Sequence, residues 1–121
     1  MVPSLTRVAP ELPVNDLADS VRHYEEKLGF RVAMLMPEGD YAIVERDGVA
    51  LHLFQNHAGR QSAASIHVFV AGLDALHAEL QARGAQLTQG IIRKPWGNRD
   101  FRVTDASGNV IKFTEPLDNS A

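Results

Sequence analysis

Hydrophobic residues recur at helical spacing in two segments of the chain. The first segment carries four apolar or aromatic residues on one helix face: Leu17, Val21, Tyr24 and Leu28. The second segment carries three leucines on one face: Leu73, Leu76 and Leu80. Asp16 precedes the first segment as an N-cap candidate, and Gly29 and Gly84 follow the two segments as residues that favour a helix end. The pattern predicts two helices, and because Leu73 follows Leu17 by 56 positions it also indicates an internal repeat.

Alternating segments flank both predicted helices and are typical of strands. Residues 7–14 precede the first helix, and residues 65–70 precede the second. Three strand-like segments follow the first helix (FRVAML, YAIVE and VALHLF), and three follow the second (AQLTQ, DFRVT and VIKFT). Residues 46–48 and the segment DASGN supply turns, whose glycines Gly48 and Gly108 stand 60 positions apart. The chain is therefore predicted to be α+β, one domain over residues 1–121 with two βαβββ repeats at about 5–56 and 63–116.

Alternation with a period of two divides each predicted strand into a core face and a second face. The residues predicted to be core are apolar: Val8, Pro10, Leu12, Val14, Leu51, Leu53, Ile66, Val68, Val70, Phe101, Val103, Ile111 and Phe113. The second face is mixed: Glu11, His52, Phe54, His67, Phe69, Asp100, Arg102 and Lys112. Aromatic and charged residues together favour a wet ligand cleft, whereas an ordinary solvated sheet face is the plainer interpretation.

Composition narrows the function classes. The chain has 121 residues, and its formal charge of −3 gives no basic footprint for nucleic acid. It has no cysteine, which excludes disulfides, thiolate metal sites and cysteine nucleophiles. The N-terminal segment lacks the apolar region of a signal peptide, and no apolar run approaches the ~18 residues of a membrane span. We therefore expect a cytoplasmic protein without a membrane or nucleic-acid partner.

Three segments of the chain resemble the bleomycin-resistance branch of the vicinal oxygen chelate superfamily, whose fold is a pair of βαβββ units. They are APELPVNDLADSVRHYEEKLGFRV, VAGLDALHAELQARG and KPWGNRDFRVTDASGNVIKFTEP. The more specific signal is the Pro-Trp-Gly corner around Trp96, which leads into RDF and D-x-x-G-N. The resemblance implies a curved mixed sheet around a cleft and a homodimer, domain-swapped or side by side, with two equivalent clefts at its interface. In this branch the clefts bind the drug without changing it chemically.

The resemblance also implies which residues meet the ligand. Trp96, the only tryptophan, would be a cleft wall that stacks on a planar aromatic group, although it could instead cap the sheet edge or pack at the dimer seam. The expected contact residues are Trp96, Tyr41, Phe54, Glu11, His52, Asp100 and Arg102. The net charge mildly favours a cationic ligand, but Arg7, Arg102 and Lys112 dilute the acidic character.

Metal catalysis is not expected at the positions where enzymes of the superfamily hold a metal. Those positions correspond here to Ala9, His52, Ser65 and Lys112, and only His52 is an ordinary ligand. Lys112 would oppose the ion, since unit charges about 4 Å apart interact by roughly 4 kcal/mol at an effective dielectric constant of about 20. A displaced site of Glu11, His52 and His67 is the alternative.

The interpretation that follows is a non-catalytic binder that sequesters a bleomycin-type antibiotic and so gives resistance. A metal-loaded drug would bring its own ion, so we expect no cofactor. The alternatives are a metal-dependent lyase, isomerase or dioxygenase, and a binder of an unknown metabolite.

Overall fold

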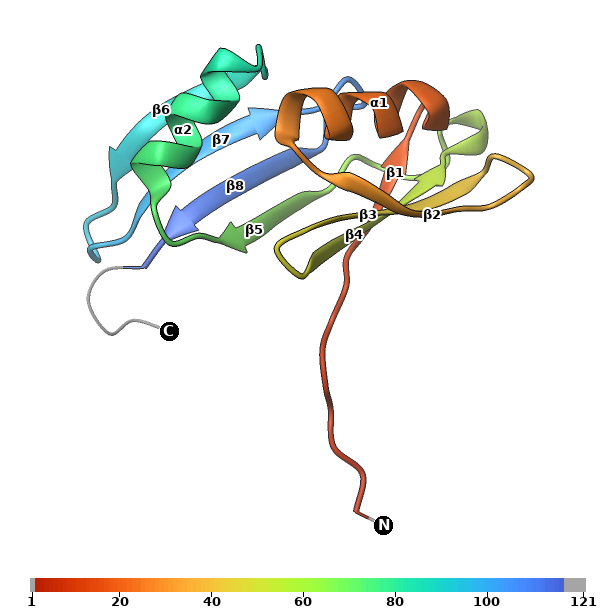
Figure 1. Ribbon diagram of the computed structural model, residues 1–121, viewed down its shortest axis with the longest axis horizontal. Coiled ribbons are helices and arrows are strands. Elements are labelled where there is room, and N and C mark those ends of the chain that lie inside the picture. Colours follow the sequence, from red (N-terminus) through yellow and green to blue (C-terminus); the bar gives the residue numbers. More distant parts are fainter. Residues whose placement is uncertain (1, 117–121) are drawn as a thin grey trace.

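The computed structural model describes residues 2–116 and contains two successive strand–helix–three-strand repeats (Figure 1). The first repeat comprises β1 (Glu11–Val14), α1 (Leu17–Leu28), β2 (Arg31–Leu35), β3 (Tyr41–Arg46) and β4 (Val49–Gln55). The second comprises β5 (Ser65–Phe69), α2 (Leu73–Ala82), β6 (Leu87–Arg93), β7 (Arg99–Thr104) and β8 (Val110–Glu115). A short 3-10 helix, η1 (His57–Gly59), lies in the connection. The predicted α+β class with two βαβββ repeats is confirmed.

Each repeat forms its own four-stranded mixed sheet. The strand orders are β1-β4-β3-β2 and β5-β8-β7-β6, and in each sheet the first strand pairs in parallel with the last. The remaining pairs are antiparallel. Both helices lie on the same side of the two sheets (Figure 1). The opposite sheet faces are therefore left without a helix, and they carry the second-face residues of the alternating pattern.

The first helix forms where the hydrophobic spacing predicts it. The side chain of Asp16 accepts a hydrogen bond of 3.0 Å from the amide of Asp19, which caps the N-terminus. The four residues of the predicted apolar face are buried: Leu17, Val21, Tyr24 and Leu28. Gly29 ends the helix at a φ of 73°, a conformation that costs a glycine little. Burial of side chains of this size contributes about 1.5–3 kcal/mol each relative to exposure.

The hydrophobic core joins the two repeats. Its fully buried sheet residues include Leu12, Val14, Ala42, Val44, Leu51, Leu53, Phe101, Val103, Ile111 and Phe113. Ile66, Val68 and Val70 pack against this cluster while remaining partly exposed. The core face predicted for β4, β7 and β8 is confirmed in full.

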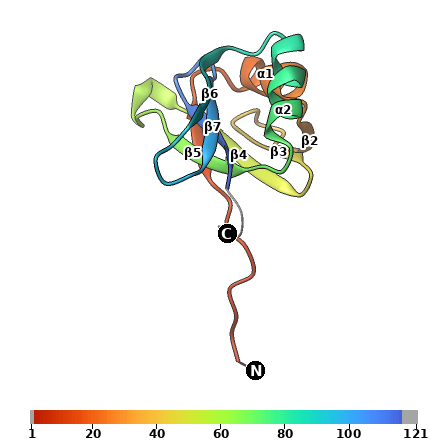
Figure 2. The same ribbon diagram turned by 90° about the vertical axis from the view of Figure 1, so that its left-hand side faces the viewer.

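The predicted strand over residues 7–14 is wrong in its first half. β1 begins only at Glu11, and the preceding residues form an extended arm that leaves the body of the molecule (Figures 1 and 2). Val8, predicted to be core, is 92% exposed. The carbonyl of Pro10 still accepts a bond of 3.0 Å from the amide of His52. Proline has no amide hydrogen to continue the ladder, and the chain departs from the sheet there.

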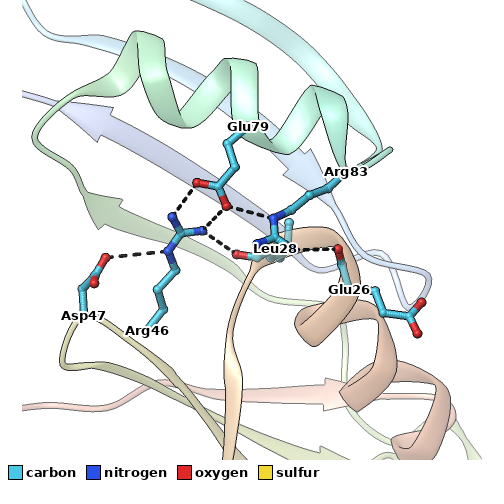
Figure 3. Close-up of polar contacts among 6 residues, drawn as sticks. All are labelled: Glu26, Leu28, Arg46, Asp47, Glu79 and Arg83. Carbon is cyan, nitrogen blue, oxygen red and sulfur yellow. Dashed lines mark hydrogen bonds and ion pairs between the residues drawn. The ribbon is translucent and has the colours of Figure 1, made fainter.

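The first tie between the repeats is an arginine clamp (Figure 3). The guanidinium of Arg46, at the end of β3, donates two hydrogen bonds of 2.9 and 2.7 Å to the carboxylate of Glu79 on α2. It also donates to the carbonyl of Leu28 at 2.9 Å. Arg83 joins the same carboxylate at 2.8 Å and reaches the carbonyl of Glu26 at 3.2 Å. The clamp therefore fixes the end of α1, the β3–β4 hairpin and α2 relative to one another.

The second tie is a buried polar network around the turn between β7 and β8. The hydroxyl of Tyr24 on α1 donates a 2.8 Å bond to Asp105, whose other oxygen accepts from the amide of Asn109 at 2.9 Å. The side-chain amide of Asn109 donates to the carbonyl of Pro13 at 2.7 Å, and its oxygen accepts from the amide of Ala64 at 2.7 Å. The D-x-x-G-N motif thus has a structural role, because it satisfies buried polar groups of both repeats.

Candidate functional site

Three of the predicted contact residues meet on the open face of the first sheet. The hydroxyl of Tyr41 donates a 2.8 Å hydrogen bond to Oε2 of Glu11 and lies 2.6 Å from Nδ1 of His52. The register explains the meeting, because Glu11 is the Cα partner of His52 on the adjacent parallel strand. Phe54 is the partner of Tyr41 and completes an aromatic edge beside the carboxylate. The structure therefore brings these three residues together, and their contact with a ligand remains a prediction.

The electrostatics of this cluster keep the phenol protonated. Burial, followed by the hydrogen bond to Glu11 and the charge of Glu11, raises the pKa of Tyr41 to about 12. A hydroxyl has one proton to donate, so while Tyr41 donates to Glu11 it can only accept from Nδ1 of His52. That tautomer leaves Nε2 of a neutral His52 as an acceptor. The cluster offers a carboxylate and an imidazole acceptor, which suits a ligand with cationic or N–H groups.

The open face of the second sheet carries a different set of residues. Arg102 is the Cα partner of Lys112, which in turn is the partner of His67. Nδ1 of His67 lies 2.9 Å from the hydroxyl of Thr114, and its ring is stacked on that of Phe69 with centroids 6.1 Å apart. This face is basic and aromatic, whereas the first sheet offers an acidic one.

Asp100 is placed differently from the expectation of an open ligand contact. Its side chain is buried, and Oδ1 accepts a 2.8 Å hydrogen bond from Nε2 of Gln89. Oδ2 lies 3.8 Å from Nζ of Lys94. These contacts hold the β6–β7 hairpin together. Direct contact of Asp100 with a ligand remains a prediction.

Trp96 stands at the tip of the β6–β7 hairpin. Its turn is closed by a 2.8 Å bond from the amide of Gly97 to the carbonyl of Lys94, with Pro95 and Trp96 as the central residues. Gly97 follows at a φ of 107°, which favours glycine. The indole side of the turn is open, since Trp96 is 72% exposed. The Pro-Gly frame therefore presents the ring to solvent, and its role as a cleft wall remains a prediction.

The seven predicted contact residues fall into two groups within one chain. Four lie on the first sheet (Glu11, Tyr41, His52 and Phe54), and three lie on the β6–β7 half of the second (Trp96, Asp100 and Arg102). A cavity of about 480 Å³ lies elsewhere, beside the Arg46–Glu79 clamp, and its apolar lining includes Phe30, Val68 and Phe113. None of the seven residues lines that cavity.

The residues at the superfamily's metal positions do not fit a metal. Ala9 lies in the arm before β1, and Ser65 and Lys112 offer a hydroxyl and an ammonium beside the single imidazole of His52. Over residues 2–116 no three His, Cys, Asp or Glu side chains converge into a potential metal site. The alternative set of Glu11, His52 and His67 is therefore not assembled within the chain. The physical reason is that Glu11 and His52 lie on the first sheet, while His67 lies on the second.

Sequence reasoning missed the polar partners that order these faces. Gln89 and Lys94, which hold Asp100, are not among the predicted site residues, and neither is Thr114, which contacts His67. Strict alternation along AQLTQ places Gln89 on the core side with Leu87, and only the register irregularity between Leu87 and Gln89 turns its side chain toward Asp100. The position of Lys94 depends on the hairpin that follows β6, and β6 runs four residues beyond the predicted strand segment, to Arg93.

Within the described part of the chain, neither helix has the length and apolar character needed to cross a membrane.

The chain matches a family model, described as Glyoxalase/Bleomycin resistance protein/Dioxygenase superfamily, over residues 4–113. The bleomycin resistance protein of Geobacillus stearothermophilus is 27% identical over 127 residues, covering 89% of this chain and 95% of that protein. The bleomycin-binding protein of bleomycin-producing Streptomyces verticillus, solved in complex with copper(II)-bleomycin, has a TM-score of 0.78 and 27% identity, covering 96% of this chain and 99% of that one. TioX from Micromonospora sp. ML1 shares the fold, with a TM-score of 0.79 at 23% identity over 93% of this chain and 99% of that one. The chain therefore belongs to the Glyoxalase/Bleomycin resistance protein/Dioxygenase superfamily.

Proposed function

We propose that this protein binds a bleomycin-type antibiotic, without catalysing a reaction, and sequesters it. The observation that carries the proposal is Trp96, the chain's only tryptophan, held 72% exposed on a closed Pro-Gly turn. An exposed indole on a rigid turn provides a surface on which a planar ligand can stack. Because the turn is already ordered, little conformational entropy is lost when the ligand binds. The relatives named above, a bleomycin resistance protein and a bleomycin-binding protein, support the choice of guest.

The acidic cluster supports the same proposal. Glu11 is exposed, and Tyr41, His52 and Phe54 beside it are half-buried, so the carboxylate can meet a cationic group while the ring of Phe54 packs against the guest. A metal-loaded drug carries its own ion. The protein then needs no metal site, in keeping with Ala9, Ser65 and Lys112 at the positions where enzymatic relatives hold a ligand.

The proposal includes a homodimer that completes the cleft. Three apolar side chains of the arm stand almost fully in water in the single chain: Val2, Leu5 and Val8. Phe69 on β5 is 60% exposed as well. Apolar surface of this kind marks an interaction site. A second copy that covers the arm would also bring the Trp96 hairpin of one protomer toward the Glu11 cluster of the other, as in the clefts implied by the resemblance.

The binding test is a titration of the purified protein with copper(II)-bleomycin while the fluorescence of Trp96 is followed. A saturable change at micromolar or tighter affinity is expected, because all the tryptophan signal comes from the proposed cleft wall. Calorimetric titration of Trp96→Ala should show at least a twofold weaker affinity, since an aromatic stack contributes about 0.5–1.5 kcal/mol beyond area burial. Leu35→Ala, which removes another exposed apolar side chain on β2, should bind like the parent.

Two outcomes would overturn the proposal. Absence of any saturable heat or fluorescence change would exclude bleomycin as the guest. Stoichiometric transition metal in the protein as isolated would instead favour the enzymatic relatives. The dimer has its own test: light scattering during gel filtration should give twice the chain mass, and replacing Leu5 and Val8 by serine should shift the equilibrium toward monomer.

A further inference from the structure

A row of nitrogen-bearing side chains crosses three strands of the second sheet. The Cα register pairs His67 on β5 with Lys112 on β8, and Lys112 with Arg102 on β7. Directly paired residues project from the same face, with Cβ atoms about 4.5–5.5 Å apart. Lys112 alternates with the buried Ile111 and Phe113, so the row lies on the face away from the core. An imidazole, an ammonium and a guanidinium are therefore neighbours there.

No carboxylate neutralises this row within residues 2–116. Arg102 and Lys112 form neither a side-chain hydrogen bond nor an ion pair with the described residues, and Nε of Arg102 is buried without a partner. The acid on the same face of β7 is Asp100, but its oxygens are already engaged by Gln89 at 2.8 Å and Lys94 at 3.8 Å. Like charges directly opposite one another destabilise a sheet. The arrangement is therefore unfavourable in the free chain, and an anion would relieve it.

The equivalent row of the first sheet has the opposite character. There the register pairs Glu11 with His52, and His52 with Ile43. His67 follows Glu11 by 56 positions and Lys112 follows His52 by 60, which are the offsets of the internal repeat. The first row thus presents a carboxylate, an imidazole and an aliphatic group where the second presents an imidazole and two cations. The two repeats divide acidic and basic contacts between them.

We propose that Arg102 and Lys112 form an oxyanion subsite, which binds a carboxylate or phosphoryl group of the guest. A guanidinium holds such groups through paired N–H donors, and an adjacent ammonium adds a point charge. The proposal rests on the function proposed above only in taking the open sheet faces as the walls of the cleft. A ligand that fills both rows would carry a cationic part for Glu11 and an acidic part for the Arg102–Lys112 pair, so the subsite extends the ligand class beyond purely cationic antibiotics.

The test uses the side-chain Nε–Hε signal of Arg102 in nuclear magnetic resonance spectra of the isotope-labelled full chain. Inorganic phosphate and, in a separate titration, acetate are added at constant ionic strength. A saturable shift of the Arg102 signal is expected with at least one of them. Phosphate alone would identify a phosphoryl guest group, acetate alone a carboxylate, and both a general oxyanion site. Lys112→Gln should weaken the affinity about tenfold, as expected for loss of a charge-assisted contact.

The matched control is Arg93→Gln, which removes the same charge from the second sheet. Arg93 is the register partner of Arg99, whose guanidinium reaches Asp74 on α2, so Arg93 lies on the other face. This variant should bind the anions like the parent. An unshifted Arg102 signal with both anions, or equal weakening by Arg93→Gln and Lys112→Gln, would overturn the proposal. A failed bleomycin titration would not overturn it, because anion binding is measured from the Arg102 signal of the protein without bleomycin.

Discussion

The hydroxyl of Tyr24 in the first repeat donates a 2.8 Å hydrogen bond to the buried carboxylate of Asp105 in the second repeat. The Arg46–Glu79 clamp makes the reciprocal connection, from the first repeat's hairpin to the second repeat's helix. Each β-hairpin turn therefore holds the helix of the other repeat. Because the two sheets share no strand pairing, these ties and the common core set how the two open faces are oriented.

Tyr24→Phe should lower the free energy of unfolding by about 1–3 kcal/mol, because it leaves a buried acceptor with one donor fewer. Urea denaturation followed by circular dichroism measures the change. Tyr41→Phe is the matched control: it removes the same hydroxyl from the chain's other tyrosine, which is half-buried and open to water. Tyr41→Phe should lower the free energy of unfolding by less than Tyr24→Phe does. Equal decreases in the two variants would contradict a special role for the Tyr24–Asp105 bond.

Gly29→Ala should destabilise the protein by about 1–2 kcal/mol through backbone strain at a φ of 73°. Steric contact of the new Cβ with the clamp side chains should add a further loss of stability. An added Cβ would lie 2.7 Å from Nη1 of Arg46 and 3.2 Å from Oε2 of Glu79, inside the clamp. Gly48→Ala separates the two effects, since Gly48 has a φ of 80° with nothing within 4 Å of the new Cβ. Midpoints of thermal unfolding should fall further for Gly29→Ala, and the same fall in both variants would exclude crowding.

Acid should weaken the clamp. Hydrogen bonds from Arg46, and then from Arg83, lower the pKa of Glu79 below its ordinary value of 4.5 in the folded chain. A lowered folded-state pKa stabilises the protein above the unfolded-state value, and this contribution is lost as the pH falls through the folded-state value. The free energy of unfolding should therefore decline below about pH 4.5.

Glu79→Gln isolates that contribution, because the variant has no carboxylate at this position for acid to protonate. Its stability should be lower than the parent's at neutral pH, and the difference should narrow between pH 5 and pH 3. Glu25→Gln on the exposed face of α1 removes the same charge without touching the clamp. Parallel pH profiles for the parent and Glu79→Gln would show that the clamp carboxylate does not govern acid unfolding.

The phenol of Tyr41 should lose its proton at a higher pH than an ordinary tyrosine. Burial and Glu11 raise its pKa to about 12, so ultraviolet absorbance should detect phenolate formation at this site well above the ordinary value of 10. Glu11→Gln should move the midpoint back toward 10, since it removes the negative charge that opposes phenolate. The raised folded-state pKa means that the hydrogen bond contributes stability fully below pH 10 and loses it as the pH rises through about 12. An unchanged midpoint in Glu11→Gln would leave burial as the cause.

The sequence by itself determined the elements and most of the core. The helix of Leu17, Val21, Tyr24 and Leu28, its Asp16 cap and the alternation of Leu51 with Leu53 are local patterns, and short-range geometry requires them wherever the chain packs. Alternation also places Glu11 and His52 on the second face, but their direct pairing depends on the register between β1 and β4, which only the structure shows. The predicted strand runs through Pro10, whereas β1 begins only at Glu11, because proline has no amide hydrogen with which to continue the ladder.

Tertiary structure decided which polar groups meet. Glu79 on α2 reaches Arg46 on β3, and Asn109 reaches Pro13, contacts 33 and 96 positions apart that no local period encodes. The fold also separated the seven expected contact residues onto two sheets and enclosed Asp100 with Gln89 and Lys94. Periodicity assigns a side chain to a face, but the distance between two faces depends on how the repeats pack, and that packing is set by long-range burial and by the two ties.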